Sequence, residues 1–421
     1  MMPERQSDTD VLIVGAGLAG LACARHLHEH GVSFTLIEAS DAVGGRVRSD
    51  HVSGFTLDRG FQVLLTGYPE AQRVLDYAKL DLHRFFPGAV IRMHNHSYRV
   101  ADPLRRPLDA FESLFSPVGT LADKFRLLRL RQRLHRQSIE SIFKREERTT
   151  IDALHEEGFS PSIISTMFRP FLRGIFLERG LNTSSRMFEF VYKMFTDGHA
   201  ALPANGMGAI PQQLADALPT DSVQLNTRVQ SVAPGLVALQ SGAQLKALAV
   251  VVATEGPEAC RLIEGLDPVT SCSTTCMYFA AENDPIGSPI LALNGDGSGI
   301  INNLCVPSAV APSYAPAGAS LISVSIIGIP SDDDRTLEMT VRSHLKSWFG
   351  PRVDSWRSFR TYRIHHALPS QAFPALSQPE RSVKVREGLY VCGDHRDTAS
   401  IQGALVSGRR TAEAFLQDIS S

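Results

Sequence analysis

The feature that most constrains this chain is an apolar run near its N-terminus that ends in a glycine-rich turn. Residues 11–14, Val-Leu-Ile-Val, lead directly into the turn 15–20, Gly-Ala-Gly-Leu-Ala-Gly. A short continuous run of this kind is typical of a parallel strand that is buried on both faces. From Leu18 to His30 the apolar residues recur at helical spacing, and Gly31 is suited to end that helix. The segment therefore predicts a strand, a tight turn and a helix.

A second predicted strand, 33–37, completes a βαβ unit and is followed by Glu38. In such a unit Gly15 permits the tight turn, Gly17 lets the backbone approach a pyrophosphate, and Gly20 lets the helix pack closely on the strand. The helix N-terminus offers free N–H groups to the phosphates. Glu38 stands where a carboxylate can accept hydrogen bonds from ribose hydroxyls. The pattern predicts a bound dinucleotide and leaves NAD and FAD both open.

The composition narrows the class of protein. A chain of 421 residues is too long for one core of ordinary size, so two domains are expected. The net charge of −2, from 42 basic and 44 acidic residues, argues against a nucleic-acid partner. The six cysteines form no C-x-x-C pair, so buried thiols in a reducing compartment, without a metal site, are expected. Because 1–10 lacks a signal pattern and no apolar run reaches the ~20 residues of a membrane span, we expect a cytoplasmic protein.

The residues that follow Glu38 separate the two cofactors. They include the turn Gly44-Gly45-Arg46. With the glycine turn and the acid, this extension resembles the flavin-containing amine oxidase, protoporphyrinogen oxidase and phytoene desaturase superfamily. The resemblance implies that Arg46 reaches the FAD pyrophosphate, because a guanidinium gives bidentate bonds to phosphate oxygens. An FAD-dependent oxidoreductase is therefore expected.

Two later segments resemble the same superfamily. Residues 58–63, Asp-Arg-Gly-Phe-Gln-Val, look like the stretch that runs along the isoalloxazine ring, and 388–394 looks like the strand whose final Gly-Asp meets the pyrophosphate and ribityl chain. Ser400 is placed to cap a helix that runs to about Leu416 and whose N-terminus would favour the reduced flavin anion. The FAD-binding residues implied in this way are Gly15, Gly17, Leu18, Ala19, Gly20, Glu38, Ala39, Gly44, Gly45, Arg46, Gly60, Phe61, Gln62, Val229, Ala253, Gly393, Asp394, Ile401 and Ala404.

The fold class implied by the resemblance is α/β, with a discontinuous Rossmann-like FAD-binding domain of the glutathione-reductase type and an α+β substrate domain. The FAD-binding domain is expected to comprise 1–85, 205–270 and 375–421. The substrate domain, with an antiparallel sheet and helices, is expected to comprise 86–204 and 271–374.

The reaction that the resemblance implies is removal of hydride from a substrate to flavin N5. Many amine oxidases of the superfamily place a lysine near N5, but 271–330 contains no lysine. We therefore expect a dehydrogenase, desaturase or oxidase for an apolar, isoprenoid-like small molecule, with O2, a quinone or another electron acceptor. The alternatives are a flavin amine oxidase and a non-redox flavoprotein such as an isomerase or dehydroxylase.

Catalytic candidates are Gln62, Tyr314, His365 and His366, which lie in segments expected near the ring. Residues 393–421 contain no cysteine, so the FAD is expected to be non-covalent.

One segment raises the question of a membrane surface. Residues 121–150 carry nine Lys or Arg against four Asp or Glu, interleaved with leucines. Such a helix can lie on an anionic membrane. We favour the alternative, a solvated helix packed on its own domain.

Overall fold

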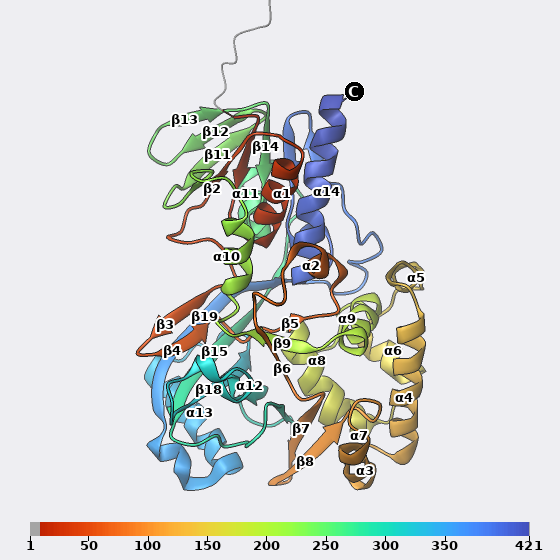
Figure 1. The fold of residues 1–421 in the computed structure, drawn as a ribbon. Coiled ribbons are helices and arrows are strands. Elements are labelled where there is room, and N and C mark those ends of the chain that lie inside the picture. The colour runs from red at the N-terminus through yellow and green to blue at the C-terminus, as the bar shows by residue number, and fades with distance from the viewer. Residues whose placement is uncertain (1–8, 421) are drawn as a thin grey trace, which may run out of the picture.

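The computed structural model describes residues 9–420, so the expectation about a signal peptide in 1–10 concerns mostly residues outside the described part. The chain forms two α/β units stacked end to end, with the C-terminal helix in the upper unit (Figure 1). Among the described residues, no helix is long and apolar enough to cross a membrane.

A six-stranded sheet forms the centre of the upper unit, and its first strand is the apolar run at 11–14. The strand order is β10 (Val223–Gln224), β2 (Phe34–Ile37), β1 (Val11–Val14), β14 (Ala249–Val252), β21 (Leu389–Val391), β20 (Lys384–Arg386). Parallel pairing places β1 between β2 and β14, and β21 pairs in parallel with the other side of β14.

Both faces of this sheet are covered, which explains why β1 is apolar throughout. Val11 and Ile13 pack in the core that holds α1 (Leu18–Glu29) and α14 (Ile401–Ser420). Leu12 and Val14 pack in a second core on the other face. That second core is closed by α11 (Gly256–Leu262) and by the sheet β11 (Val229–Ala233), β12 (Leu236–Leu239) and β13 (Gln244–Lys246).

Two stretches in this region, 223–232 and 245–253, each contribute to two strands and not to one. The first contributes to β10 and β11, which belong to different sheets, because the backbone turns at Asn226 with φ of 53°. The second contributes to β13 and β14, which also belong to different sheets. The C-terminal helix begins where expected but continues to Ser420 rather than stopping near Leu416.

A seven-stranded, mostly antiparallel sheet forms the lower unit. One of its faces packs on α13 (Asp334–Phe349), and the other faces a layer of helices. Its order is β19 (Arg357–Pro369), β15 (Ser271–Ala281), β18 (Ser320–Ile327), β17 (Asn303–Cys305), β16 (Leu291–Asn294), β7 (Gly88–Met93), β8 (His96–Ala101). The helices are α3 (Pro107–Phe115), α4 (Leu121–Arg136), α5 (Ile139–Lys144), α6 (Thr150–Glu156), α7 (Pro161–Ile163), α8 (Arg169–Phe176) and α9 (Ser185–Asp197), with a π-helical turn at Ile164–Phe168.

The basic segment 121–150 is therefore not one helix. Ser138 accepts a hydrogen bond from the N–H of Ser141 and so caps α5, which separates it from α4. The hairpin β7–β8 turns at His94 and Asn95, whose φ angles are 51° and 61°. His94 and His96 are exposed there, and no group of three or more metal-ligating residues exists among residues 9–420.

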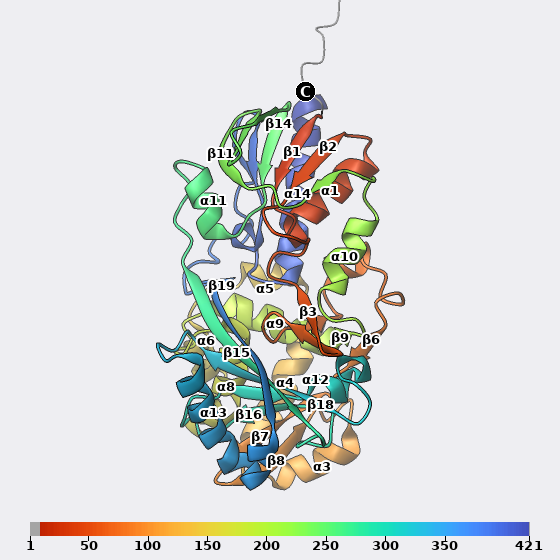
Figure 2. The same ribbon diagram turned by 90° about the vertical axis from the view of Figure 1, so that its left-hand side faces the viewer.

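The strands of the two large sheets come from alternating stretches of the chain, and shorter elements connect the two units. All strands of the first sheet lie in 1–85, 205–270 and 375–421, and all strands of the second lie in 86–204 and 271–374. The long strands β15 and β19 run from the lower unit toward the upper one (Figure 2). The connecting elements are β3 (Ser49–Val52), β4 (Phe55–Asp58), β5 (Leu64–Leu65), α2 (Pro69–Val74), β6 (Leu82–Arg84), β9 (Ala200–Pro203), α10 (Ala209–Asp216), α12 (Pro307–Val310) and the 3-10 turns η2 (Pro312–Tyr314), η3 (Gly350–Ser355) and η4 (Asp394–Arg396).

Candidate active site

A cavity of about 1110 Å³ runs from the glycine turn after β1 into the lower unit. Its upper part is lined by backbone and side chains from the first sheet and from the start of α14. Its lower part is lined by β7, β8, α4, α8, α9 and the second sheet. One continuous space therefore connects the predicted nucleotide site with the predicted substrate domain.

The glycine turn has the conformation that its sequence predicts. Gly15 has φ of 109°, and a Cβ there would lie 2.8 Å from the Ala253 carbonyl oxygen. A Cβ on Gly20 would lie 2.0 Å from the Gly15 carbonyl oxygen, so Gly20 serves close packing and does not itself line the cavity. A Cβ on Gly17 would meet no atom within 4 Å, which leaves open space beside this backbone at the start of α1. The free N–H groups there are available to an anionic group.

Glu38 is held beside this turn by local hydrogen bonds. The N–H of Ala16 donates to its Oε2 at 2.8 Å, and the N–H and hydroxyl of Ser40 donate to its Oε1 at 2.8 and 2.7 Å. These bonds orient the carboxylate at the cavity edge, where Ala39 also lies. Each oxygen retains lone-pair capacity for a ribose hydroxyl.

Arg46 joins the Gly44-Gly45 turn to the returning C-terminal chain. Its Nη2 donates to Asp394 Oδ1 at 2.7 Å and its Nη1 donates to the Ala367 carbonyl oxygen at 3.1 Å. Burial opposes the charge on the guanidinium, but the Asp394 carboxylate outweighs that penalty and raises the pKa of Arg46. Arg46 is therefore a permanent cation that lines the cavity between two backbone turns.

The N-terminus of α14 is aimed at the middle of the cavity. Ser400 Oγ accepts a hydrogen bond from the N–H of Gly403 at 3.0 Å, as its predicted capping role requires. Ile401 and Ala404 line the cavity from the first turn of the helix. The positive end of a 20-residue helix therefore faces this space.

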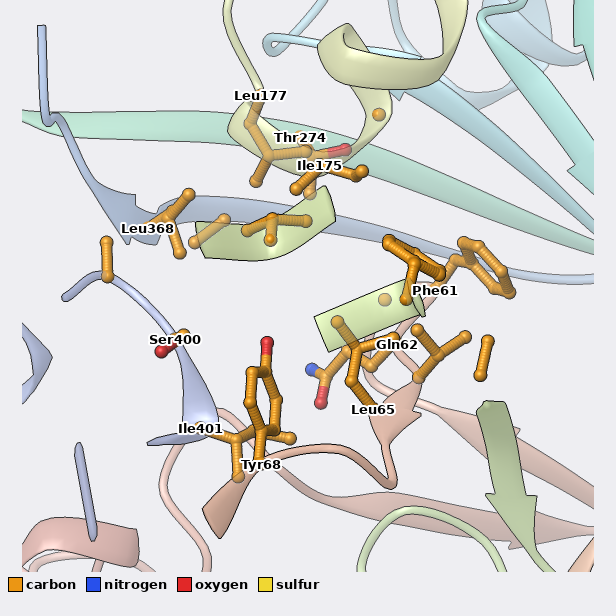
Figure 3. Close-up of a pocket in the computed structure, with 18 of the residues that line it drawn as sticks. Phe61, Gln62, Leu65, Tyr68, Ile175, Leu177, Thr274, Leu368, Ser400 and Ile401 are labelled. Carbon is orange, nitrogen blue, oxygen red and sulfur yellow. The ribbon is translucent and has the colours of Figure 1, made fainter. Parts of the chain in front are cut away.

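The middle of the cavity is bounded by two opposed sets of side chains (Figure 3). Tyr68 and Ile401 lie on one side, with Gln62 and Leu65 beside them, and Leu177 and Thr274 lie on the other. Leu177 ends α8 with φ of 55°, a left-handed conformation that is unfavourable for a leucine. Burial raises the pKa of the Tyr68 phenol, so its hydroxyl stays protonated in the cavity.

The predicted cofactor residues are brought together from segments far apart in the sequence. Every one of them except Gly20 lines this cavity, including Val229 of β11 and Ala253 after β14. Gly60 has φ of 94°, a left-handed backbone conformation that favours glycine, and a Cβ there would lie 2.6 Å from Ile364 Cδ1.

The four catalytic candidates are placed differently from one another. Gln62 lines the cavity, but its Nε2 donates to the Arg46 carbonyl oxygen at 2.8 Å. Tyr314 is fully buried and lies outside the cavity lining, where its hydroxyl donates to Asp58 Oδ2 at 2.8 Å. His365 and His366 are exposed and also outside the lining, because β19 is the edge strand of its sheet. Their neighbour Ile364 lines the cavity instead.

Sequence reasoning missed most of the walls in the lower part of the cavity. These are mainly apolar or aromatic side chains from several separate elements: Met167, Phe171, Ile175, Leu177, Tyr192, Phe195, Leu291, Leu293, Ile327, Ile364 and Leu368. In the sequence such residues are indistinguishable from ordinary core, because their patterns reflect burial and not what they are buried against. Tyr68 had a partial signal, since it follows closely on the segment 58–63.

Charged residues gather at the lower end of the cavity. Asp102 lines it together with Arg105 and Arg131, and its Oδ2 lies 3.7 and 3.2 Å from the Nε atoms of these two arginines. Lys124 of α4 also lines this end. The carboxylate is thus already paired with two cations.

The fold and the site define a protein of two α/β units with a glycine-lined cleft that opens into a second, largely apolar chamber. A family model for flavin-containing amine oxidoreductases matches residues 18–416, and the chain belongs to that family. The family is one of flavin-containing oxidoreductases, and the residues around the cleft fit such a cofactor because glycine backbone, a cation and an oriented carboxylate line it.

Similarity to individual proteins is limited in extent. Protoporphyrinogen oxidase 2 of Arabidopsis thaliana is 27% identical over 171 residues, which are 41% of this chain and 33% of that protein. Amine oxidase B of Cavia porcellus is 34% identical over 119 residues, 27% of this chain and 21% of that protein. The matches thus span about a third or less of these relatives.

Solved structures match over nearly the whole fold. An oxidoreductase from Methanosarcina mazei has a TM-score of 0.75 at 15% identity, covering 96% of this chain and all of that one. Cyclohexylamine oxidase from Brevibacterium oxydans has a TM-score of 0.69 at 16% identity, covering 98% of this chain and all of that one. These structures share the fold.

Proposed function

We propose that this protein is an oxidoreductase with non-covalently bound FAD that dehydrogenates an apolar small molecule. The observation that carries the proposal is the second chamber, which continues the nucleotide cleft and has walls mainly of leucine, isoleucine, phenylalanine and methionine. Apolar walls hold an apolar substrate by excluding water, and they hold a cation poorly.

The charges along the lower chamber favour a substrate without a positive charge. Asp102 is the acidic residue among those that line the chamber, and Arg105 and Arg131 already neutralise it. Among the described residues that line this chamber, a substrate ammonium would meet a carboxylate that is already paired. This distribution ranks an apolar substrate above the amine of the alternative hypothesis.

The chain's own residues would bind and orient both molecules. Glu38 would accept hydrogen bonds from the ribose, and Arg46 with the N-terminus of α1 would hold the pyrophosphate. The positive end of α14 would stabilise negative charge at the end of the flavin that it faces. When bound, the flavin supplies the hydride-accepting chemistry. Tyr68, Leu177 and Leu368 would position the substrate and exclude water from the middle of the cavity.

Non-covalent attachment has a separate support. None of the six cysteines lines the cavity, and Cys392, which directly precedes Gly393, is fully buried. Acid precipitation of the purified protein should release all of its flavin into the supernatant as FAD. Flavin retained in the pellet would refute this part of the proposal.

The decisive experiment is anaerobic mixing of the flavin-loaded protein with a panel of lipophilic alkenes and alcohols and with a panel of amines. We expect loss of the visible flavin absorbance with a member of the first panel only. Reduction by amines, with peroxide and ammonia released in air, would establish the amine oxidase instead. Turnover that requires prereduced flavin but consumes no reductant would establish the non-redox alternative.

A further inference from the structure

Large apolar side chains are exposed on and beside α3 and α4, and two of them line the lower end of the cavity. Five of the ten large apolar side chains that are exposed in the described part of the chain come from 104–125. Leu108 is 88% exposed, and Leu121 and Phe125 are each 69% exposed. We call Leu104, Leu108, Phe115, Leu121 and Phe125 the α3–α4 patch.

The way α4 packs explains why this patch faces outward. Leu130 and Leu134 are fully buried in the core that also holds α9. Leu121, Phe125 and Arg129 follow one another at intervals of four and share another face of the helix, which is exposed. The start of the helix is fixed by a capping box between Thr120 and Asp123, so this face has a defined orientation.

The cavity reaches the protein surface inside this patch. Leu121 and Phe125 line the cavity and are at the same time mostly exposed. Lys124 and Leu128, on the adjoining strip of α4, line it as well. An apolar molecule that leaves the chamber here would therefore pass between exposed apolar side chains. Helix α3 lies at the end of the molecule away from β1 (Figures 1 and 2).

The surroundings of the patch carry a positive charge. Residues 104–136 contain eight Lys or Arg and three Asp or Glu. Three of these cations, Arg105, Arg131 and Arg133, pair with acids outside this range, and Arg129 and Arg136 are among the remaining five. Of the three acids, Asp123 is fully buried and accepts hydrogen bonds from Thr120 and Ser160. The exposed residues Arg129 and Arg136 lie on the same side of α4 as Phe125. An apolar patch flanked by cations matches the chemistry of an anionic lipid surface.

We propose that the α3–α4 patch docks this protein on a bilayer containing anionic phospholipids, with the cavity mouth against the membrane. The side chains of the patch enter the interface while the arginines of α4 face the lipid headgroups. An apolar substrate then passes between membrane and chamber without crossing water. This route rests on the proposed function, but the docking itself does not require any substrate.

Vesicle flotation of the flavin-loaded, full-length protein tests the docking without turnover. Vesicles of phosphatidylcholine alone and of phosphatidylcholine with phosphatidylglycerol are compared at low and high salt. We expect binding to the mixed vesicles that weakens as salt rises. Absence of lipid-dependent flotation at low salt would overturn the proposal, whatever the substrate proves to be.

Variants locate the surface that binds. Leu108→Ser, Leu121→Ser and Phe125→Ser combined should lower partitioning at least about tenfold, because each side chain loses its burial in the interface. Leu248→Ser combined with Met339→Ser removes side chains that are 60% and 56% exposed elsewhere, and should leave partitioning unchanged. Arg129→Gln and Arg136→Gln should each weaken binding about fivefold at low salt.

Two further measurements complete the test. All variants should retain bound FAD like the wild type, which shows that they are folded. Equal flotation of the triple variant and the wild type would overturn the proposal. A second copy of the chain is the other occupant that an apolar patch can have, and native mass measurement tests for it. A wild-type dimer that becomes monomeric in the triple variant, together with no vesicle binding, would overturn the docking and assign the patch to a dimer interface.

Discussion

At the scale of single residues, the site depends on a few positions whose conformation or charge is unusual. Arg46 bridges the Gly44-Gly45 turn to Asp394, although 348 residues separate the two side chains in sequence. Leu177 and Leu181 both have left-handed backbones, with φ of 55° and 59°, but only Leu177 lines the cavity. These residues can be tested one at a time.

Arg46→Ala should weaken FAD binding by roughly 2–3 kcal/mol, because it removes a cation from the cleft and leaves the buried Asp394 unpaired. Arg46→Lys keeps the charge but loses the forked geometry, so its FAD affinity should lie between those of the wild type and Arg46→Ala. Titration of the apoproteins with FAD, followed by flavin fluorescence, gives the affinities. An Arg46→Ala variant with wild-type affinity would contradict the assignment of Arg46 to the cofactor.

Leu177→Gly should leave the free energy of unfolding nearly unchanged while raising KM severalfold. Relief of the left-handed strain, about 1–2 kcal/mol, offsets the lost side-chain burial, but one wall of the chamber disappears. Leu181→Gly is the matched control, since Leu181 is fully buried and does not line the cavity. That variant should be less stable with an unchanged KM. Urea unfolding and steady-state kinetics of both variants distinguish the effects.

At the scale of elements, a buried carboxyl joins pieces of both units. Asp58, at the end of β4, accepts hydrogen bonds from the Ser49 hydroxyl at 2.5 Å, the Met207 N–H at 2.9 Å and the Tyr314 hydroxyl at 2.8 Å. The Tyr278 hydroxyl of β15 donates to its backbone carbonyl at 2.9 Å. Burial raises the pKa of the Asp58 carboxyl to about 6, although the hydrogen bonds that it accepts lower the pKa in part.

The raised pKa predicts the direction of a stability change with pH. Between pH 4 and 6 the folded protein binds more protons at Asp58 than the unfolded chain, so its contribution to stability is present at low pH and lost as pH rises. From pH 4 to pH 6 the free energy of unfolding of the wild type should fall by up to about 3 kcal/mol relative to that of Asp58→Asn. Urea unfolding at a series of pH values measures the difference. A constant difference would show that Asp58 does not titrate there.

Tyr314→Phe separates this structural role from a catalytic one. Loss of the hydroxyl should cost about 1–2 kcal/mol of unfolding free energy, because Asp58 loses a donor in a buried site. Turnover should stay close to wild type, since Tyr314 lies outside the cavity lining. A large fall in kcat at unchanged stability would restore Tyr314 as a catalytic candidate.

At the scale of the whole molecule, the two units share one core. A single apolar cluster holds Val11 and Leu36 of the first sheet, Phe168 and Phe190 of the helical layer, and Tyr278 of the second sheet. The chain also passes repeatedly between the units, since the strands of each sheet come from separate stretches. Independent unfolding of either unit would expose that shared core.

We therefore expect one cooperative unfolding transition with coincident probes. Of the two tryptophans, Trp356 lies in the core beside the second sheet and Trp348 packs against that core, so both report on the lower unit. Flavin fluorescence on release reports on the upper unit. Added FAD should raise both midpoints together, because it binds only the folded state. A tryptophan transition that precedes flavin release would show that the lower unit unfolds alone.

Local motifs in the sequence were enough to predict the glycine-lined part of the cavity. The glycine turn, Glu38 and the Gly44-Gly45-Arg46 turn are contiguous motifs whose backbone demands are local, and Gly15 and Gly20 occupy the tight contacts that these demands imply. The return of the chain at Gly393 could be recognised because it too is a local strand and turn.

The apolar chamber became apparent only from the way distant segments pack together. The walls of the chamber come from helices and strands far apart in the chain, and their apolar side chains look like core until the surrounding space is seen. The tertiary structure also decided that Tyr314 faces Asp58, that His365 and His366 face solvent, and that α4 presents Leu121 to the cavity mouth. Such outcomes depend on which sheet face, edge or helix side meets which neighbour, and a linear pattern does not encode that choice.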